Sequence, residues 1–108
     1  MQNRYCITMK VASNLQAVYD TFMQIVDSNK MKIKKEKISK GSFYVLASEK
    51  MNWFALNWPT RIEITARQVK ENIIFELASS SFMTSLTQNS KNSKTLEYFA
   101  QSMKIYLE

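Results

Sequence analysis

A run of lysines is the clearest candidate for contact with an anion. The eleven residues from Lys30 to Lys40 hold six lysines and one glutamate, and therefore five of the six net positive charges of the chain. Such a run attracts nucleic acid or an acidic membrane surface. It also suits a solvated edge strand, where lysines block pairing between sheets. Alternation along a strand predicts that successive lysines point to opposite faces, which favours the edge strand. The candidate anion contacts are Lys32, Lys34, Lys35 and Lys37.

A second candidate lies in the segment from Met51 to Pro59. It carries Trp53, Phe54 and Trp58 within six residues and is apolar at both alternating positions. A regular strand cannot turn all three rings toward one core. Either some of them lie on a second surface, such as the lip of a ligand pocket, a dimer interface or a membrane-touching loop, or a bulge turns them all inward.

The residues that perform most catalysis are missing. The chain has no histidine, one cysteine and one glycine, which excludes His-dependent triads, zinc clusters, internal disulfides and glycine-rich phosphate loops. Ser79, Ser80 and Ser81 lack the elbow motif of a serine nucleophile. Glu63 and Glu76 could face each other on adjacent strands, but charge pairing with Arg61 and Arg67 explains them better. We expect no catalytic residue, no metal site and no cofactor.

The same inventory indicates a single cytoplasmic domain spanning residues 1–108. The N-terminus lacks the apolar stretch of a signal peptide, and the longest apolar run has five residues, against about 20 for a membrane span. Cys6 lies in an expected strand and is interpreted as a small buried apolar residue in a reducing compartment.

Hydrophobic periodicity predicts the elements that position these residues. A half-buried strand over Tyr5–Val11 precedes a helix from about Asn14 to Ser28, with Ser13 and Gln16 as a capping box. A second helix follows a polar stretch at 88–94, is capped by Ser93 and turns Phe99 and Met103 inward. Between the helices, strands are expected over 32–39, 42–49, 61–67 and 73–78, and one extra strand could lie in 53–58 or 81–87.

The order is thus β-α-β4-α. Hairpin-length connections make the sheet antiparallel, and two helices with one apolar stripe each can cover one of its faces. The predicted fold class is an α+β two-layer sandwich.

Three motifs resemble those of small bacterial domains in the helix-grip superfamily, which includes START and Bet v 1-like proteins. These domains have a Trp-Gly turn before a strand, serines at the end of the next strand and a Gly-Lys-Asn loop before the last helix. Pro59 and Ser90 stand where the family has glycines. The matching stretches here are 57–62, 79–81 and 88–92. The resemblance implies a helix-grip fold and a ligand held between sheet and C-terminal helix.

The leading hypothesis is a non-enzymatic domain that binds a small apolar or amphipathic ligand at that place. The residues expected to contact it are Trp53, Phe54, Trp58, Phe99 and Met103. The alternative is a module for a protein partner, a second copy or a membrane surface, using the Trp53–Trp58 segment and the Lys30–Lys40 strand. Nucleic acid ranks below both, because the lysine run holds no arginine for bidentate recognition.

Overall fold

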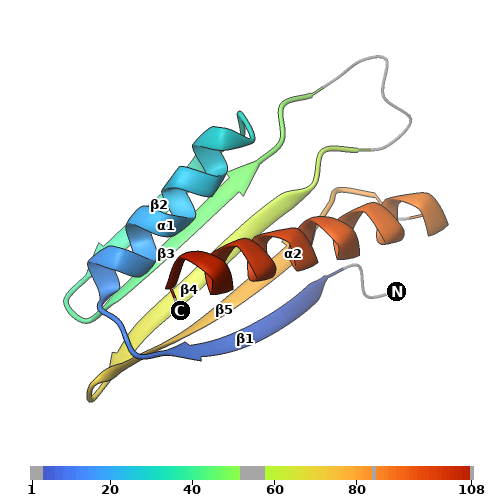
Figure 1. Ribbon diagram of the computed structural model, residues 1–108. Coiled ribbons are helices and arrows are strands. Elements are labelled where there is room, and N and C mark those ends of the chain that lie inside the picture. The colour runs from blue at the N-terminus through green and yellow to red at the C-terminus, as the bar shows by residue number, and fades with distance from the viewer. Residues whose placement is uncertain (1–3, 52–57, 84, 108) are drawn as a thin grey trace.

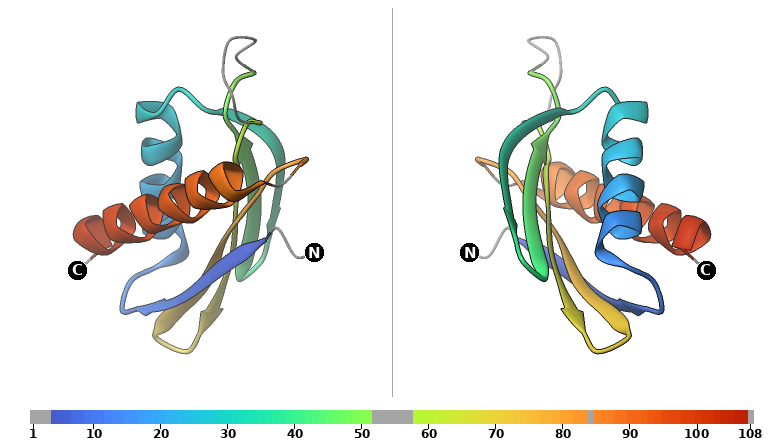
Figure 2. Two further views of the ribbon diagram at one scale, coloured as in Figure 1. Left: turned by 90° about the vertical axis from the view of Figure 1, so that its right-hand side faces the viewer. Right: turned by 90° about the vertical axis from the view of Figure 1, so that its left-hand side faces the viewer.

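The computed structural model describes residues 4–51, 58–83 and 85–107. One antiparallel sheet forms one layer and two helices form the other, so the predicted α+β sandwich is confirmed (Figures 1 and 2). The molecule is elongated, 44 Å along its longest axis. Its elements are β1 (Tyr5–Val11), α1 (Leu15–Ser28), β2 (Lys32–Ser39), β3 (Ser42–Ser48), β4 (Arg61–Val69), β5 (Asn72–Ser80) and α2 (Leu86–Leu107).

The strands lie in the order β1-β5-β4-β3-β2, and all neighbours are antiparallel. Tight turns at 40–41 and 70–71 join β2 to β3 and β4 to β5. Gly41 has a φ of 82°, a left-handed conformation that suits a residue without a Cβ atom. These turns share the hairpin end of the sheet. The loop end is opposite, where β3 ends, β4 begins and β5 leads into α2.

The core lies between the helices and one face of the sheet. On that face β4 buries Ile62, Ile64 and Ala66, as its alternation predicts, and β3 and β5 contribute in the same way. The buried side chains of α1 are Val18, Phe22, Ile25 and Val26, and those of α2 include Leu96, Phe99 and Met103. The other side of the sheet, the open face, carries no helix of the described residues (Figure 2).

Two expectations at the start of the chain are wrong. Asn14, not Ser13, caps α1, because its Oδ1 accepts a hydrogen bond from the Ala17 amide at 2.8 Å. Cys6 is exposed rather than buried, since it stands opposite Ala78 on the open face of an edge strand. Its sulfur accepts a hydrogen bond from Arg4 at 2.9 Å.

The second helix begins at Leu86, well before the expected cap at Ser93. The Ser85 hydroxyl accepts from the Gln88 amide at 3.0 Å, which is the hydrogen bond of an N-terminal cap. The polar stretch at 88–94 therefore lies inside α2, and Gln88 and Asn92 continue its buried stripe. Hydrophobic periodicity missed this part because its inward-facing residues are amides.

Candidate functional site

A groove of about 470 Å³ opens at the loop end of the sheet. This volume is within the range of about 300–1,000 Å³ that ligand pockets occupy. The groove brings together two segments that the sequence singled out separately, the lysine strand and the stretch around Trp58. We call it the tip groove; its lining residues are Lys32, Lys34, Ser48, Glu49, Lys50, Met51, Trp58, Pro59, Arg61 and Phe82.

Four cationic side chains line the tip groove, and two of them come from β2. The register between β2 and β3 shifts between Ile33 and Lys35, so that one residue of β2 is left over. This bulge places Lys32 and Lys35 opposite successive open-face residues of β3. The expectation that successive lysines alternate between faces is therefore wrong at this point. Lys50 and Arg61 supply the other two charges.

An aromatic pair forms the apolar wall of the groove. The rings of Trp58 and Phe82 lie 5.3 Å apart between centroids, tilted by 53°. Both remain accessible to solvent, at 42% and 72% exposed. The sequence predicted a role for Trp58 but missed Phe82, which follows the end of β5. Trp53 and Phe54, the other expected aromatic contacts, lie outside the described residues.

The first turns of α2 hold the backbone of Trp58 on both sides. Its amide donates to Gln88 Oε1 at 2.6 Å, and its carbonyl accepts from Lys91 Nζ at 3.1 Å. The same ammonium group forms an ion pair with Glu49 at 2.6 Å. Glu49 also accepts from the Thr60 amide at 2.8 Å. Lys91 thus neutralises Glu49, the carboxylate among the described lining residues. The four lining cations therefore give the groove a net positive charge.

A buried polar cluster lies behind this wall. Asn92 Oδ1 accepts from Thr60 Oγ1 at 2.7 Å and from Gln88 Nε2 at 2.8 Å, while its Nδ2 donates to Ser81 Oγ at 3.0 Å. All four residues are buried. Hydrogen bonds in a low-dielectric interior hold side chains in one position, because a buried polar group without a partner there costs free energy. The cluster ties the start of α2 to the segments before β4 and after β5.

Four predicted contacts among the described residues do not line the tip groove. Phe99 and Met103 are buried in the core, where the ring of Phe99 lies 5.7 Å from that of Phe22. Lys35 and Lys37 are exposed on β2, opposite Leu46 and Tyr44 of the open face. The structure therefore brings Trp58, Lys32 and Lys34 together and places these four predicted contacts elsewhere.

The open face holds a network of charges of its own. Arg4 approaches Glu63 at 3.7 Å and Glu76 at 3.2 Å, so the residue just before β1 takes the place of the expected partners Arg61 and Arg67. Tyr44 donates to Glu63 at 2.5 Å. Burial, and then this hydrogen bond, raise the pKa of the Tyr44 phenol to about 12.

Ser79 is the first of the three consecutive serines considered as nucleophiles. Ser79 is fully buried, and its hydroxyl has no hydrogen-bond partner among the described residues. Within the same ranges, no three histidine, cysteine, aspartate or glutamate side chains gather as metal ligands. No helix of the described parts of the chain is long and apolar enough to cross a membrane.

Comparison with known proteins supports the fold. No protein-family model matches the sequence, and no curated protein matches it. Among solved structures, the chain is similar to the vertebrate conserved region of human METTL16, with a TM-score of 0.66 and 11% identity over 95% of this chain and 98% of that one. A DUF4468 family protein from Bacteroides ovatus gives 0.53 and 14%, covering 96% of this chain and 85% of its own. The Ran-binding protein Mog1p from Saccharomyces cerevisiae gives 0.50 and 11%, covering 97% and 65%. At these identities the likeness concerns the fold alone.

Proposed function

We propose that this chain is a non-enzymatic binding domain whose tip groove takes an amphipathic, anionic ligand. The observation that carries the proposal is the composition of the groove wall. The four cations of the groove could contact an anionic group, and the Trp58–Phe82 pair offers an apolar surface beside them. These cations are Lys32, Lys34, Lys50 and Arg61. Cations next to exposed rings suit a ligand with a charged head and an apolar body.

The position of the ligand differs from the one that the sequence led us to expect. A ligand between sheet and C-terminal helix would have to displace Phe99 and Met103, which are packed in the core. The tip groove requires no such rearrangement. Its wall is also held in place before binding, because Gln88 and Lys91 fix the backbone of Trp58. A wall that is already ordered costs less entropy when a ligand binds.

The test uses three probes that separate charge from apolar contact: octyl phosphate, octyl glucoside and inorganic phosphate. The two octyl compounds are used below their critical micelle concentrations. Amide chemical shifts should move at the groove with octyl phosphate, and binding should be much weaker with either of the others. Changing Lys32 and Lys34 to Gln should lower the affinity about tenfold at low salt.

The matched control changes Lys35 and Lys37 to Gln, which removes the same charge from the same strand outside the groove. This control should leave the affinity nearly unchanged. An equal loss in both double variants would mean that binding follows net charge, and the groove would not be the site. Absence of any response to octyl phosphate would overturn the proposal.

A further inference from the structure

Several of the exposed apolar side chains among the described residues gather at the loop end. Phe82 and Met83 follow β5, and Leu86 opens α2, where it is 91% exposed. Met51 follows β3 and Trp58 precedes β4, and both are also exposed. Single exposed apolar residues are ordinary, but a cluster contributed by two connections at one end marks an interaction surface.

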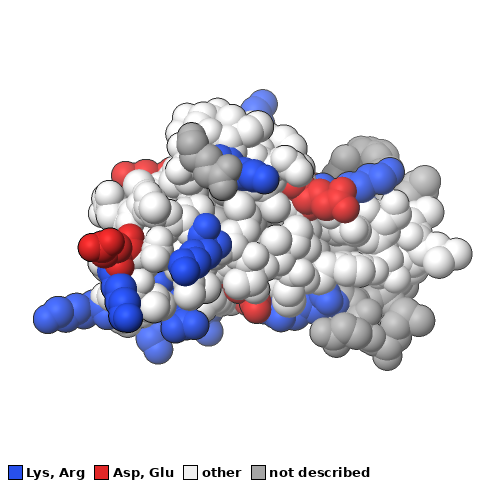
Figure 3. All heavy atoms as spheres, turned by 60° about the horizontal axis from the view of Figure 1, so that its bottom comes forward, with Lys and Arg blue, Asp and Glu red and all other residues white. Residues whose placement is uncertain are grey.

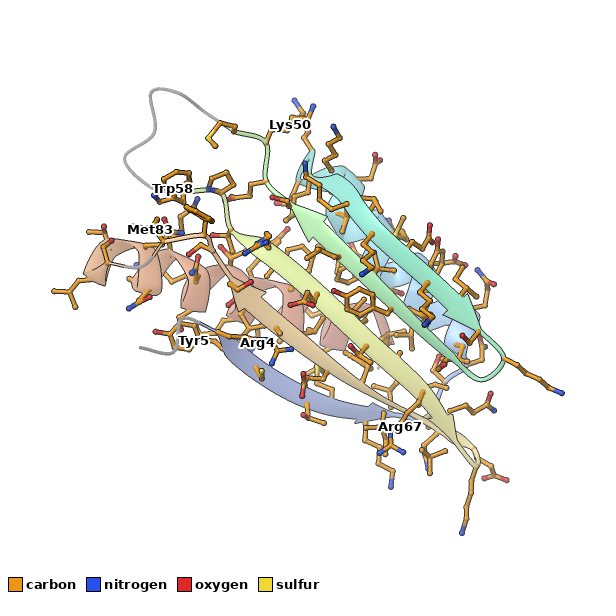
Figure 4. The ribbon with its side chains drawn as sticks, turned by 180° about the vertical axis from the view of Figure 1, so that it is seen from behind. Arg4, Tyr5, Lys50, Trp58, Arg67 and Met83 are labelled. Carbon is orange, nitrogen blue, oxygen red and sulfur yellow. The ribbon has the colours of Figure 1, made fainter. Side chains whose placement is uncertain are left out.

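Basic side chains surround this apolar end. Lys32, Lys34, Lys50 and Arg61 lie along the tip groove, directly beside Trp58 and Phe82. Figure 4 places Lys50, Trp58 and Met83 at the same end of the molecule, with Arg67 at the other. In the right-hand part of Figure 3 the described surface is mainly uncharged, with basic side chains above and below it and an acidic patch beside the upper ones.

We propose that the loop end docks on an anionic lipid bilayer, which names the partner of the tip groove and rests on the function proposed above. Phe82, Met83 and Leu86 enter the boundary between headgroups and acyl chains. The lysines behind them meet the lipid phosphates and carboxylates. Apolar groups in front and cations behind match the order of layers at a membrane surface.

Trp58 fits the same orientation. Its indole is half-exposed between the apolar end and the cations, and tryptophan is enriched at the headgroup level of membranes. Its backbone is held by Gln88 and Lys91 from α2, so the ring is presented on a rigid support. The long axis of 44 Å leaves the hairpin end well away from the bilayer when the loop end touches it.

Co-sedimentation with vesicles tests the proposal. The full chain should bind vesicles of mixed phosphatidylcholine and phosphatidylserine, bind phosphatidylcholine alone much more weakly, and be released by salt. Changing Phe82 and Leu86 to Ser should lower the partition coefficient by at least about tenfold, because two exposed apolar groups no longer enter the lipid. Circular dichroism checks that the variant is folded.

The matched control changes Ile105 and Tyr106 to Ser. These residues are also exposed, Ile105 to 74%, but they lie at the far end of α2. The control should bind vesicles like the unmodified chain. Equal loss in both variants, or binding that is indifferent to phosphatidylserine, would overturn the docking proposal.

The two proposals fail in different ways. Binding of octyl phosphate without binding of any vesicle would overturn docking and leave the groove ligand in place. Vesicle binding that depends on Phe82 and Leu86, without a response to octyl phosphate, would support docking and overturn the soluble ligand. Vesicle binding that persists when Lys32 and Lys34 are Gln would contradict the contact between these cations and the lipid headgroups, and with it the docking proposal.

Discussion

The backbone amide of Trp58 donates to the side-chain oxygen of Gln88 at 2.6 Å, across thirty positions of sequence. Gln88 is almost fully buried, and its side-chain Nε2 donates in turn to Asn92 Oδ1. The groove wall is therefore attached to the polar interior of the α2 N-terminus rather than to the hydrophobic core. The geometry of the candidate site and the stability of this helix end should change together.

Replacement of Gln88 by Leu tests this coupling. The substitution keeps the volume, but it leaves the Trp58 amide without its acceptor and removes one of the two hydrogen bonds that Asn92 Oδ1 accepts. We therefore expect a loss of about 1–3 kcal/mol in the free energy of unfolding. Denaturant titration measures the loss. Gln101, exposed on the same helix, provides the control, and Gln101→Leu should change the stability by less than about 0.5 kcal/mol. Equal stabilities for the two variants would contradict the coupling.

A second prediction concerns the hydrophobic end of α2. Phe99 is 1% exposed and packs against Phe22, so Phe99→Ala should cost about 3–5 kcal/mol. Tyr106→Ala, at an exposed position of the same helix, should cost far less. Denaturant titration of both variants decides. A loss below about 1 kcal/mol for Phe99→Ala would mean that α2 does not hold the sheet, because cores of this kind respond strongly to truncation.

The lysine strand gives a third prediction. Lys32, Lys34, Lys35 and Lys37 are exposed on an edge strand, so changing all four to Gln should leave the unfolding midpoint nearly unchanged. Thermal unfolding by circular dichroism measures it. A clear loss of stability would show that these charges support the fold rather than a partner.

The sequence predicted the fold because its apolar residues carry clean periods. Ile62, Ile64 and Ala66 alternate, and Val18 and Phe22 repeat at helical spacing, so strands, helices and their inner faces followed from pattern alone. The site was predicted only in part. The bulge in β2 that places Lys32 in line with Lys35 depends on pairing with β3, which the sequence of β2 does not encode.

Contacts that form only in the folded chain also explain why the start of α2 was not predicted. Gln88 and Asn92 look like loop residues until Thr60 and Ser81 are brought beside them by tertiary folding. One local signal in the sequence could have indicated the start of α2. Ser85 stands three residues before Gln88, which is the spacing of a capping box.

The last prediction uses the phenol of Tyr44, whose pKa of about 12 exceeds the ordinary value of 10.0 because of burial and the hydrogen bond to Glu63. A raised pKa means that the folded state prefers the neutral phenol. Its contribution to stability is fully present below pH 10 and is lost as the pH rises toward 12. A titration followed by tyrosinate absorbance should show a step near pH 12, and Tyr44→Phe should remove it. Glu63→Gln should lower the pKa of Tyr44 only in part, since burial, the larger cause, remains. If Tyr44→Phe instead removed a step at the ordinary value, the Tyr44–Glu63 contact would not exist in solution.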